Sequence, residues 1–324
     1  MKKINTLHFS SFLITILFFS GQVFAQFTNG QSADLVLGQP DFTTGSSGVG
    51  IAKMNYPFGL AINPISGACY VSDSNNSRVL RFPATLVSSM NADKVLGQSD
   101  FDMDSSSTSA STLKASSGSS FDSNGNLWVA DYYNYRVLMF RDADNKANGA
   151  LADLVLGQAD FNSAVSSISQ TGISSPEAIH IDTTGRLWVA DSSNNRVVWY
   201  DNAENLSNGA PANGVLGQSD FTGSGEAATA DRFSYPSGVF VDKSNHLWII
   251  DCGNNRVLRF DNPNSLATGA SANAVLGQTD FITTTHGTSA SQMYCPYRST
   301  VDSLGTLWVT DYGNNRVLGF LISH

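Results

Sequence analysis

Three side chains could carry out acid–base chemistry or hold an anion: Glu177, His180 and Arg298, which stand outside the pattern that the rest of the chain repeats. The glutamate and the histidine could accept and donate protons, and the arginine could bind an anionic substrate. These roles would make the protein a lyase or a hydrolase. The sequence carries no H-E-x-x-H, G-x-S-x-G or phosphate-binding glycine motif. We therefore favour a binding protein and keep the enzyme as the alternative hypothesis.

A wider set of aromatic and charged residues suits binding rather than catalysis. Corresponding positions of the repeats differ most clearly at Phe58, Tyr132, Tyr133, Glu177, His180, Tyr297, Arg298 and Tyr312. Tyrosine combines an apolar ring with a polar hydroxyl, which suits contact with a glycan, a peptide or a protein. Loop residues also vary without selection, so a purely architectural repeat protein is a further alternative.

Acidic residues raise the question of a metal site. Five carboxylates recur at one level of the repeats: Asp41, Asp100, Asp160, Asp220 and Asp280. A cation could bridge some of them, but we expect each to cap its own loop. The segment 100–104 has the alternating acids of a calcium loop, yet Ser105 replaces the turn glycine and Ser111 stands where the closing glutamate belongs. We predict no cofactor, with calcium as the weaker alternative.

Two of the three cysteines are candidates for a disulfide. Cys252 and Cys295 are expected on the same face of neighbouring repeats, and we predict a bond between them, which an oxidising compartment permits. Such a bond requires Cα atoms within about 7 Å. Cys69 is expected to be a buried thiol in a strand.

The elements that position these residues come from an internal repeat of about sixty residues. The motif V-L-G-Q-x-D-F begins at Val36, Val95, Val155, Val215 and Val275. The motif D-x-x-N-x-R-V alternates with it and begins at Asp73, Asp131, Asp191, Asp251 and Asp311. Because the aspartate, asparagine and arginine of the second motif occur in every copy, we interpret them as structural. A reaction centre is normally one asymmetric group of residues.

Each repeat predicts four short antiparallel strands, which in the fourth copy cover 238–241, 247–250, 256–260 and 274–278. The central strands are apolar on both faces, as expected when neighbouring sheets cover each sheet on both sides. We predict an all-β fold, a five-bladed β-propeller of four-stranded antiparallel blades. Asn29–Gln39 resembles the fourth strand of a repeat, and we expect it to pair beside Arg316–Phe320, complete the last blade and close the ring.

The repeats resemble those of the NHL-repeat propellers. The resemblance rests on P-x-G-x-x-x-D at Pro236, Gly238 and Asp242, followed by L-W-I-I-D and N-N-R-V-L-R-F. Members of that family more often have six blades built from shorter repeats. The family includes RNA-binding and protein-binding domains, a peptide-amidating lyase and many secreted bacterial proteins, so the resemblance does not select one activity.

The N-terminal residues and the charge balance limit location and partners. Lys2 and Lys3, the apolar run 12–19 and Val23–Ala25 predict a secretory signal peptide over residues 1–25, with one propeller domain over 26–324. Removing that peptide leaves 16 basic and 27 acidic residues, a net charge of −11, which disfavours nucleic acid. We predict a secreted or periplasmic monomer without a membrane span, whose partner is an extracellular glycan, peptide or protein.

Overall fold

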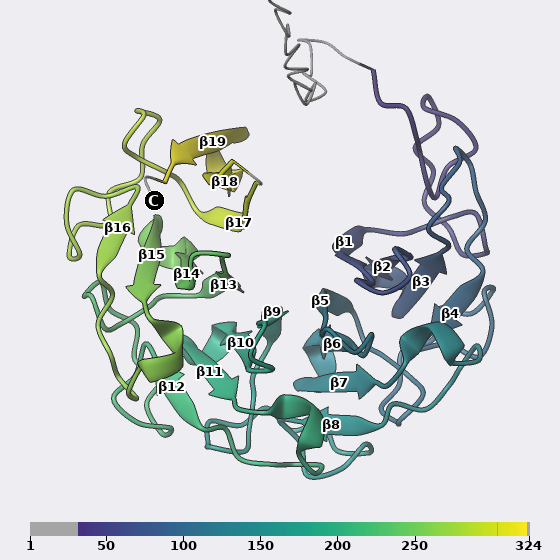
Figure 1. Ribbon diagram of the computed structural model, residues 1–324, viewed down its shortest axis with the longest axis horizontal. Helices are drawn as coiled ribbons and strands as arrows, with labels where there is room; N and C mark the ends of the chain where they lie inside the picture. The colour runs from purple at the N-terminus through teal and green to yellow at the C-terminus, as the bar shows by residue number, and fades with distance from the viewer. Residues whose placement is uncertain (1–31, 303, 323–324) are drawn as a thin grey trace, which may run out of the picture. The chain divides into compact units, whose positions relative to one another are not determined.

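The computed structural model describes residues 32–302 and 304–322. The predicted signal peptide at 1–25 and residues 26–31 lie outside the described residues. The chain divides into Met1–Asp34 and a compact unit, Leu35–His324, whose fold is described here. Within this unit, five antiparallel sheets follow one another around a common axis, with the first strand of each sheet innermost (Figure 1). The prediction of a five-bladed, all-β propeller is confirmed.

Blades 1 to 4 are four-stranded meanders, and blade 5 has three strands in the described residues. Blade 1 consists of β1 (Pro57–Ile62), β2 (Cys69–Asp73), β3 (Arg78–Phe82) and β4 (Lys94–Leu96). Blade 2 consists of β5 (Ser116–Phe121), β6 (Leu127–Asp131), β7 (Arg136–Phe140) and β8 (Leu154–Leu156). Blade 3 consists of β9 (Pro176–Ile181), β10 (Leu187–Asp191), β11 (Arg196–Tyr200) and β12 (Gly214–Leu216). Blade 4 consists of β13 (Pro236–Val241), β14 (His246–Asp251), β15 (Arg256–Asp261) and β16 (Ala274–Leu276). Blade 5 consists of β17 (Pro296–Val301), β18 (Thr306–Asp311) and β19 (Arg316–Leu321).

Short 3-10 helices lie in the turns between strands. Those between the second and third strands of the blades are η1 (Ser74–Asn76), η2 (Tyr132–Asn134), η4 (Ser192–Asn194), η6 (Cys252–Asn254) and η8 (Tyr312–Asn314). Those that follow the third strands of blades 2, 3 and 4 are η3 (Ala143–Asn145), η5 (Ala203–Asn205) and η7 (Pro263–Ser265).

The core lies between the sheets. All residues of β6 and β10 are buried, because a neighbouring blade covers each face of these strands. The tryptophan of β10, Trp188, also satisfies its indole N–H, which donates to Asp182 Oδ2 at 3.0 Å. Burial of both faces explains why these strands are apolar throughout instead of alternating, as the sequence indicated.

The repeated aspartate, asparagine and arginine hold each blade to its loops. In blade 3, Asp191 Oδ2 accepts hydrogen bonds from Arg196 Nε at 2.7 Å and from Asn194 Nδ2 at 2.8 Å. The other nitrogens of Arg196 donate to three loop carbonyls, those of Ser169, Gly172 and Phe221. The aspartate–asparagine–arginine contacts recur in each blade, so these residues are structural, as expected from their repetition. Blade 5 differs in one acceptor, because Arg316 donates to the carbonyl of Thr288 where the arginines of blades 1 to 4 donate to a phenylalanine carbonyl.

The V-L-G-Q-x-D-F motif ends each fourth strand and starts the loop to the next blade. Gly157 directly follows β8 and has a φ of +85°, and Ile173 packs so closely on it that a Cβ there would lie 2.7 Å from the Ile173 side chain. Three residues later, Asp160 accepts a hydrogen bond from the backbone N–H of Asn162 at 2.9 Å. The loop aspartates therefore cap their own loops, as expected.

The predicted closure of the ring by residues 29–39 is wrong for the part that the structure describes. Residues 32–39 form no strand, and no fourth strand pairs with β19 among the described residues. The carbonyl of Val36 instead accepts a hydrogen bond from the N–H of Ser89 in blade 1, at 2.8 Å. Val95, Val155 and Val215 make the same contact with the blade that follows each of them. Val36 thus keeps the contact of a fourth strand with its next blade but lacks the strand partner.

Candidate functional site at the loop face

The loop that precedes each first strand and the 3-10 turn that follows each second strand share one face of the propeller. In blade 3, the N–H of Ser192 donates to the carbonyl of Ser175 at 3.3 Å, and in blade 5 the N–H of Gly313 donates to that of Tyr294 at 2.8 Å. We call this side the loop face. The candidates Tyr132, Tyr297 and Tyr312 belong to these turns and strand starts, as the topology predicted.

Glu177 and Tyr297 meet across the propeller, although 120 residues separate them in the chain. Glu177 is the second residue of β9, after Pro176, and is buried. Tyr297 is the second residue of β17, after Pro296. The hydroxyl of Tyr297 donates to Glu177 Oε1 at 2.6 Å. Burial and the neighbouring carboxylate raise the pKa of Tyr297. The tyrosine therefore stays protonated and remains a hydrogen-bond donor to Glu177.

Arg298 completes this inner cluster. Its Nη2 lies 3.6 Å from Glu177 Oε1 and donates to the carbonyl of Glu177 at 3.2 Å. The guanidinium also lies over two aromatic rings, at 4.7 Å from the centroid of Phe58 and 4.9 Å from that of Tyr297. Since blades 1, 3 and 5 supply these residues, the cluster forms only in the folded ring. We call Phe58, Glu177, Tyr297 and Arg298 the anchor.

Tyrosines surround the anchor. The ring of Tyr312 lies 5.5 Å from that of Tyr297, and the hydroxyl of Tyr132 lies 3.3 Å from that of Tyr235. Tyr133 packs edge-on against Tyr132 at 4.8 Å. Seven of the eight predicted site residues therefore gather at the anchor and in the tyrosine contacts around it.

Two tyrosines of this surface, Tyr56 and Tyr235, were missed by the sequence analysis. Each directly precedes the proline that starts a first strand and has a positive φ, 58° for Tyr56 and 49° for Tyr235. A bulky residue in this left-handed region is uncommon and costs conformational energy. The sequence feature that could have identified both tyrosines is the dipeptide Tyr-Pro, which occurs at this position in the first and fourth repeats. The other repeats have Ala-Ser, Ser-Pro and Cys-Pro there.

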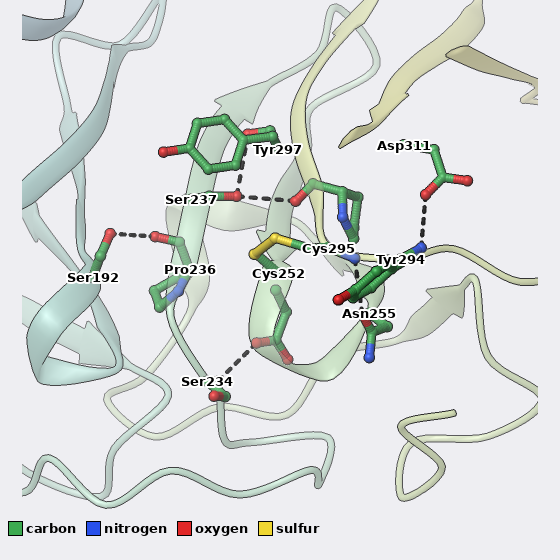
Figure 2. The surroundings of a disulfide bond; sticks show 12 residues. Ser192, Ser234, Pro236, Ser237, Cys252, Asn255, Tyr294, Cys295, Tyr297 and Asp311 are labelled. Atoms are coloured by element: carbon green, nitrogen blue, oxygen red, sulfur yellow. Dashed lines mark hydrogen bonds between the residues drawn. A yellow bond between two sulfur atoms is a disulfide. The ribbon is translucent and has the colours of Figure 1, made fainter. Parts of the chain in front are cut away.

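The disulfide lies beside the anchor. Cys252 in η6 is bonded to Cys295, and their Cα atoms are 4.2 Å apart (Figure 2). Cys295 precedes Tyr297 by two residues, and its N–H donates to Asn255 Oδ1 at 2.8 Å. Ser237 Oγ donates to the carbonyl of Tyr297 at 3.1 Å. The disulfide and these hydrogen bonds join blade 4 to the start of β17 and so position Tyr297 and Arg298. Cys69 is a buried free cysteine.

His180 is the predicted site residue that does not join the anchor. It lies on β9 opposite Trp188 of β10, and its imidazole has no hydrogen-bond partner among the described residues. Burial lowers the pKa of His180 to about 4, while the charge of Asp182 opposes this shift, so the ring is neutral at pH 7. Glu177 is engaged by Tyr297 and Arg298, so the structure does not pair Glu177 with His180 for acid–base chemistry.

A cavity of about 830 Å³ lies among the first strands. It is lined by Phe58 and Arg298 of the anchor, by His180, and by apolar residues such as Leu60 and Phe240. Its size and its mixed lining of apolar and polar residues are of the kind that holds a small molecule. Phe58 and Arg298 therefore line this cavity and also belong to the anchor that the tyrosines contact.

Neither a metal cluster nor a membrane helix occurs in the described part of the chain. No group of three or more histidine, cysteine, aspartate or glutamate residues is placed there to hold a metal ion. The prediction of no cofactor, with calcium as its alternative, stays a prediction. Within residues 32–302 and 304–322, no helix has the length and apolar character needed to cross a bilayer.

Comparisons with known proteins agree with the fold. The family model of the NHL repeat matches residues 174–200 and 233–260, which cover β9 to β11 and β13 to β15. No curated protein matches the chain. A solved structure titled "Crystal structure of Nidogen/Laminin Complex" superimposes with a TM-score of 0.53 and 17% sequence identity, covering 83% of this chain and 77% of that chain. At this identity the likeness supports the fold alone.

Proposed function

Because this chain is a β-propeller that carries NHL repeats, we propose that it is a binding module whose loop face holds a protein or peptide partner outside the cytoplasm. The observation that carries the proposal is a set of outward tyrosines around a rigid anchor. Tyr56, Tyr133 and Tyr312 are 63%, 51% and 67% exposed, while Glu177 within the anchor is 3% exposed. Rigid, exposed tyrosines supply large contact areas at low entropic cost, which is typical of protein-binding surfaces.

The anchor supports the surface rather than a reaction. Its carboxylate accepts the hydroxyl of Tyr297, and its guanidinium lies between two rings, so both charged groups hold aromatic side chains in place. A substrate would have to displace these contacts to reach Glu177. This arrangement favours binding over the lyase or hydrolase alternative.

A place of action outside the cytoplasm is part of the proposal. The disulfide between Cys252 and Cys295 is of a kind that persists in oxidising compartments, and the predicted signal peptide at residues 1–25 leads to the same compartment. A glycan is the alternative ligand, since tyrosine rings also stack on sugars.

The test compares two variants of the purified chain on a glycan array and on an array of extracellular proteins and peptides. The triple variant Tyr56→Ser, Tyr133→Ser and Tyr312→Ser removes the outward rings. Leu151→Ser, which changes an exposed apolar residue of the loop between β7 and β8, is the control. We expect a protein or peptide ligand whose affinity falls more than tenfold in the triple variant and stays unchanged in the control, since each lost tyrosine costs about 1–2 kcal/mol. Equal binding by the triple variant, or binding to glycans alone, would contradict the proposal.

A further inference from the structure

The cavity of about 830 Å³ is formed by the first strands of all five blades. These strands, β1, β5, β9, β13 and β17, are innermost in Figure 1 and supply most of the lining. The volume lies within the range of pockets that hold small molecules, about 300–1,000 Å³. The outward tyrosines Tyr56, Tyr133 and Tyr312 do not line it. The cavity is therefore a candidate site distinct from the surface proposed to bind a protein.

The wall of the cavity carries a broad apolar surface. Leu60 and Ile62 of β1 line it and are 64% and 50% exposed. Phe121, Ile179 and Phe240 line it from blades 2, 3 and 4. Covering apolar side chains of this kind removes them from water and favours binding. A ligand of the cavity therefore presents a mainly apolar surface.

Two nitrogen-bearing side chains of the lining keep hydrogen-bonding capacity to spare. His180 lines the cavity from β9, and its imidazole has no hydrogen-bond partner among the described residues. Arg298 lines it from β17 and donates to three backbone carbonyls through Nη1 and Nη2. Its Nε has no hydrogen-bond partner in the described part of the chain. A neutral imidazole both donates and accepts, and Nε donates, so either can hold a polar group of a ligand.

Two serines make the lining differ from blade to blade. Ser119 of β5 and Ser299 of β17 stand where β1, β9 and β13 have Leu60, Ile179 and Val239. The hydroxyls of both serines are buried and have no hydrogen-bond partner within residues 32–302 and 304–322. Polar positions therefore alternate with apolar ones around the axis. An uneven lining suits one asymmetric molecule better than a purely hydrocarbon filling.

The charges at the inner end of the cavity are balanced within the protein. Nη2 of Arg298 lies 3.6 Å from Glu177 Oε1, so the guanidinium already faces a carboxylate. Burial lowers the pKa of His180 to about 4, and the imidazole is neutral at pH 7. An anion bound here would meet the carboxylate of Glu177, and a cation would meet Arg298.

The charged residues that follow the first strands are satisfied in other ways. Asp242 and Asp302 line the cavity, but each accepts backbone N–H groups of its own turn and one indole N–H. Lys243, in the same turn as Asp242, is exposed to water. Because none of these groups offers an unpaired charge to the interior, an ion in the cavity would lose its hydration without gaining a counter-ion.

We propose that the cavity binds a small, uncharged and mainly apolar molecule that carries a hydrogen-bonding group. The molecule lies among the first strands, covers Leu60 and Phe240 with its apolar part and exchanges a hydrogen bond with the imidazole of His180. This site does not depend on the proposed protein-binding function. The triple variant Tyr56→Ser, Tyr133→Ser and Tyr312→Ser should keep it, so failure of one proposal would leave the other standing.

The test uses the full-length chain and two fluorescent probes that differ by one charged group. N-phenyl-1-naphthylamine is uncharged and has one N–H donor, and 1-anilinonaphthalene-8-sulfonate adds a sulfonate to the same rings. We expect saturable binding of one uncharged probe per chain at pH 7, and at least about tenfold weaker binding of the sulfonate. Absence of binding by the uncharged probe, or equal affinity for both probes, would overturn the proposal.

Two leucines of nearly equal exposure locate the probe. Leu60 lines the cavity and is 64% exposed, and Leu151 lies in the loop between β7 and β8 and is 63% exposed. Leu60→Glu should weaken binding of the uncharged probe at least about tenfold, because it places a carboxylate in the wall. Leu151→Glu is the matched control and should bind normally. Both variants should keep the native melting curve, since both side chains already contact water. Equal affinities of the two variants would place the probe outside the cavity and overturn the proposal.

A spectroscopic measurement asks whether the ligand contacts His180. In protein with nitrogen-15 in its histidine side chains, the signals missing from His180→Phe identify those of His180. We expect these signals to move when the uncharged probe saturates the protein, while those of the other histidines stay in place. His180→Phe should bind the probe about fivefold more weakly, because one hydrogen bond is lost. Unmoved His180 signals at saturation would show that the imidazole does not hold the ligand and would overturn the assignment.

Discussion

Blade 3 and blade 5 have almost the same sequence in their central strands but very different surroundings. Leu187–Asp191 of β10 is buried at every position, whereas in β18 both Trp308 and Thr310 are exposed. Blade 3 has a packed sheet on each side, whereas the sheet face of blade 5 packs only against blade 4 among the described sheets, apart from the contacts of Tyr297 and Arg298 in the anchor. The comparison teaches that the repeat motif specifies the fold of a blade, while the neighbouring blades decide how much each residue stabilises the protein.

The largest expected difference concerns the repeated arginine. In blade 3, Arg196 and Asp191 form an ion pair with both side chains fully buried, whereas in blade 5 the side chain of Arg316 is 28% exposed. We expect Arg196→Met to lower the free energy of unfolding by about 4 kcal/mol, because it leaves a buried carboxylate without its partner. Arg316→Met should cost about 2 kcal/mol, since water can reach the vacated position. Urea unfolding of both variants measures the difference, and equal losses would show that the two blades are equivalent in solution.

The disulfide gives blade 5 a link that blade 3 does not need. At the position of Cys252, blade 3 has Ser192, whose Oγ donates to the carbonyl of Pro236 at 2.5 Å and so joins blades 3 and 4 (Figure 2). The Cys252–Cys295 bond joins residues separated by 43 positions in the chain, and we expect Cys252→Ser to cost about 3 kcal/mol. Hydrogen exchange should rise first in β17 to β19. Cys69→Ser is the control for loss of a thiol, and uniform acceleration over all five blades would refute a local role of the disulfide.

The smallest expected effect is a pH dependence from His180. Its pKa is lowered from 6.5 to about 4 by burial in the folded chain, so below pH 6.5 the unfolded chain binds a proton that the folded chain does not. The contribution of His180 to the free energy of unfolding should therefore be constant above pH 6.5 and fall by about 2 kcal/mol between pH 6.5 and pH 4. This figure is smaller than the full pKa difference implies, because water partly reaches the imidazole ring.

Two variants isolate this contribution. His180→Phe, which follows the residue at position 240 of blade 4, should remove this part of the pH dependence. Thr300→His places an imidazole at the corresponding exposed position of blade 5, where it should keep an ordinary pKa and add no slope. Melting temperatures measured from pH 4 to pH 8 would decide; an unchanged slope in His180→Phe would show that another group is responsible.

The sequence predicted the blades well because their determinants are local. The Asp191–Arg196 segment contains its own turn, its own ion pair and the start of a strand, so five similar copies indicate five similar sheets.

The expected fourth strand at 274–278 ends earlier, at Leu276, because Gly277 has a φ of +87° and turns the chain away from the sheet. The site was predicted in part: positions that break the repeat pointed to the anchor, but Tyr56 and Tyr235 were missed because their importance depends on a left-handed backbone in front of Pro57 and Pro236.

The sequence by itself determined the propeller, the structural role of its repeated charges and the few positions at which blades differ. These properties follow from residues that lie close together in the chain or recur at a constant spacing. Only the tertiary structure decided that Glu177, Tyr297 and Arg298 form one anchor, that His180 lies apart from it and that blade 5 has three strands within residues 32–302 and 304–322. These features depend on how blades distant in sequence approach one another, and the distances involved are set by side-chain packing between sheets rather than by any local pattern.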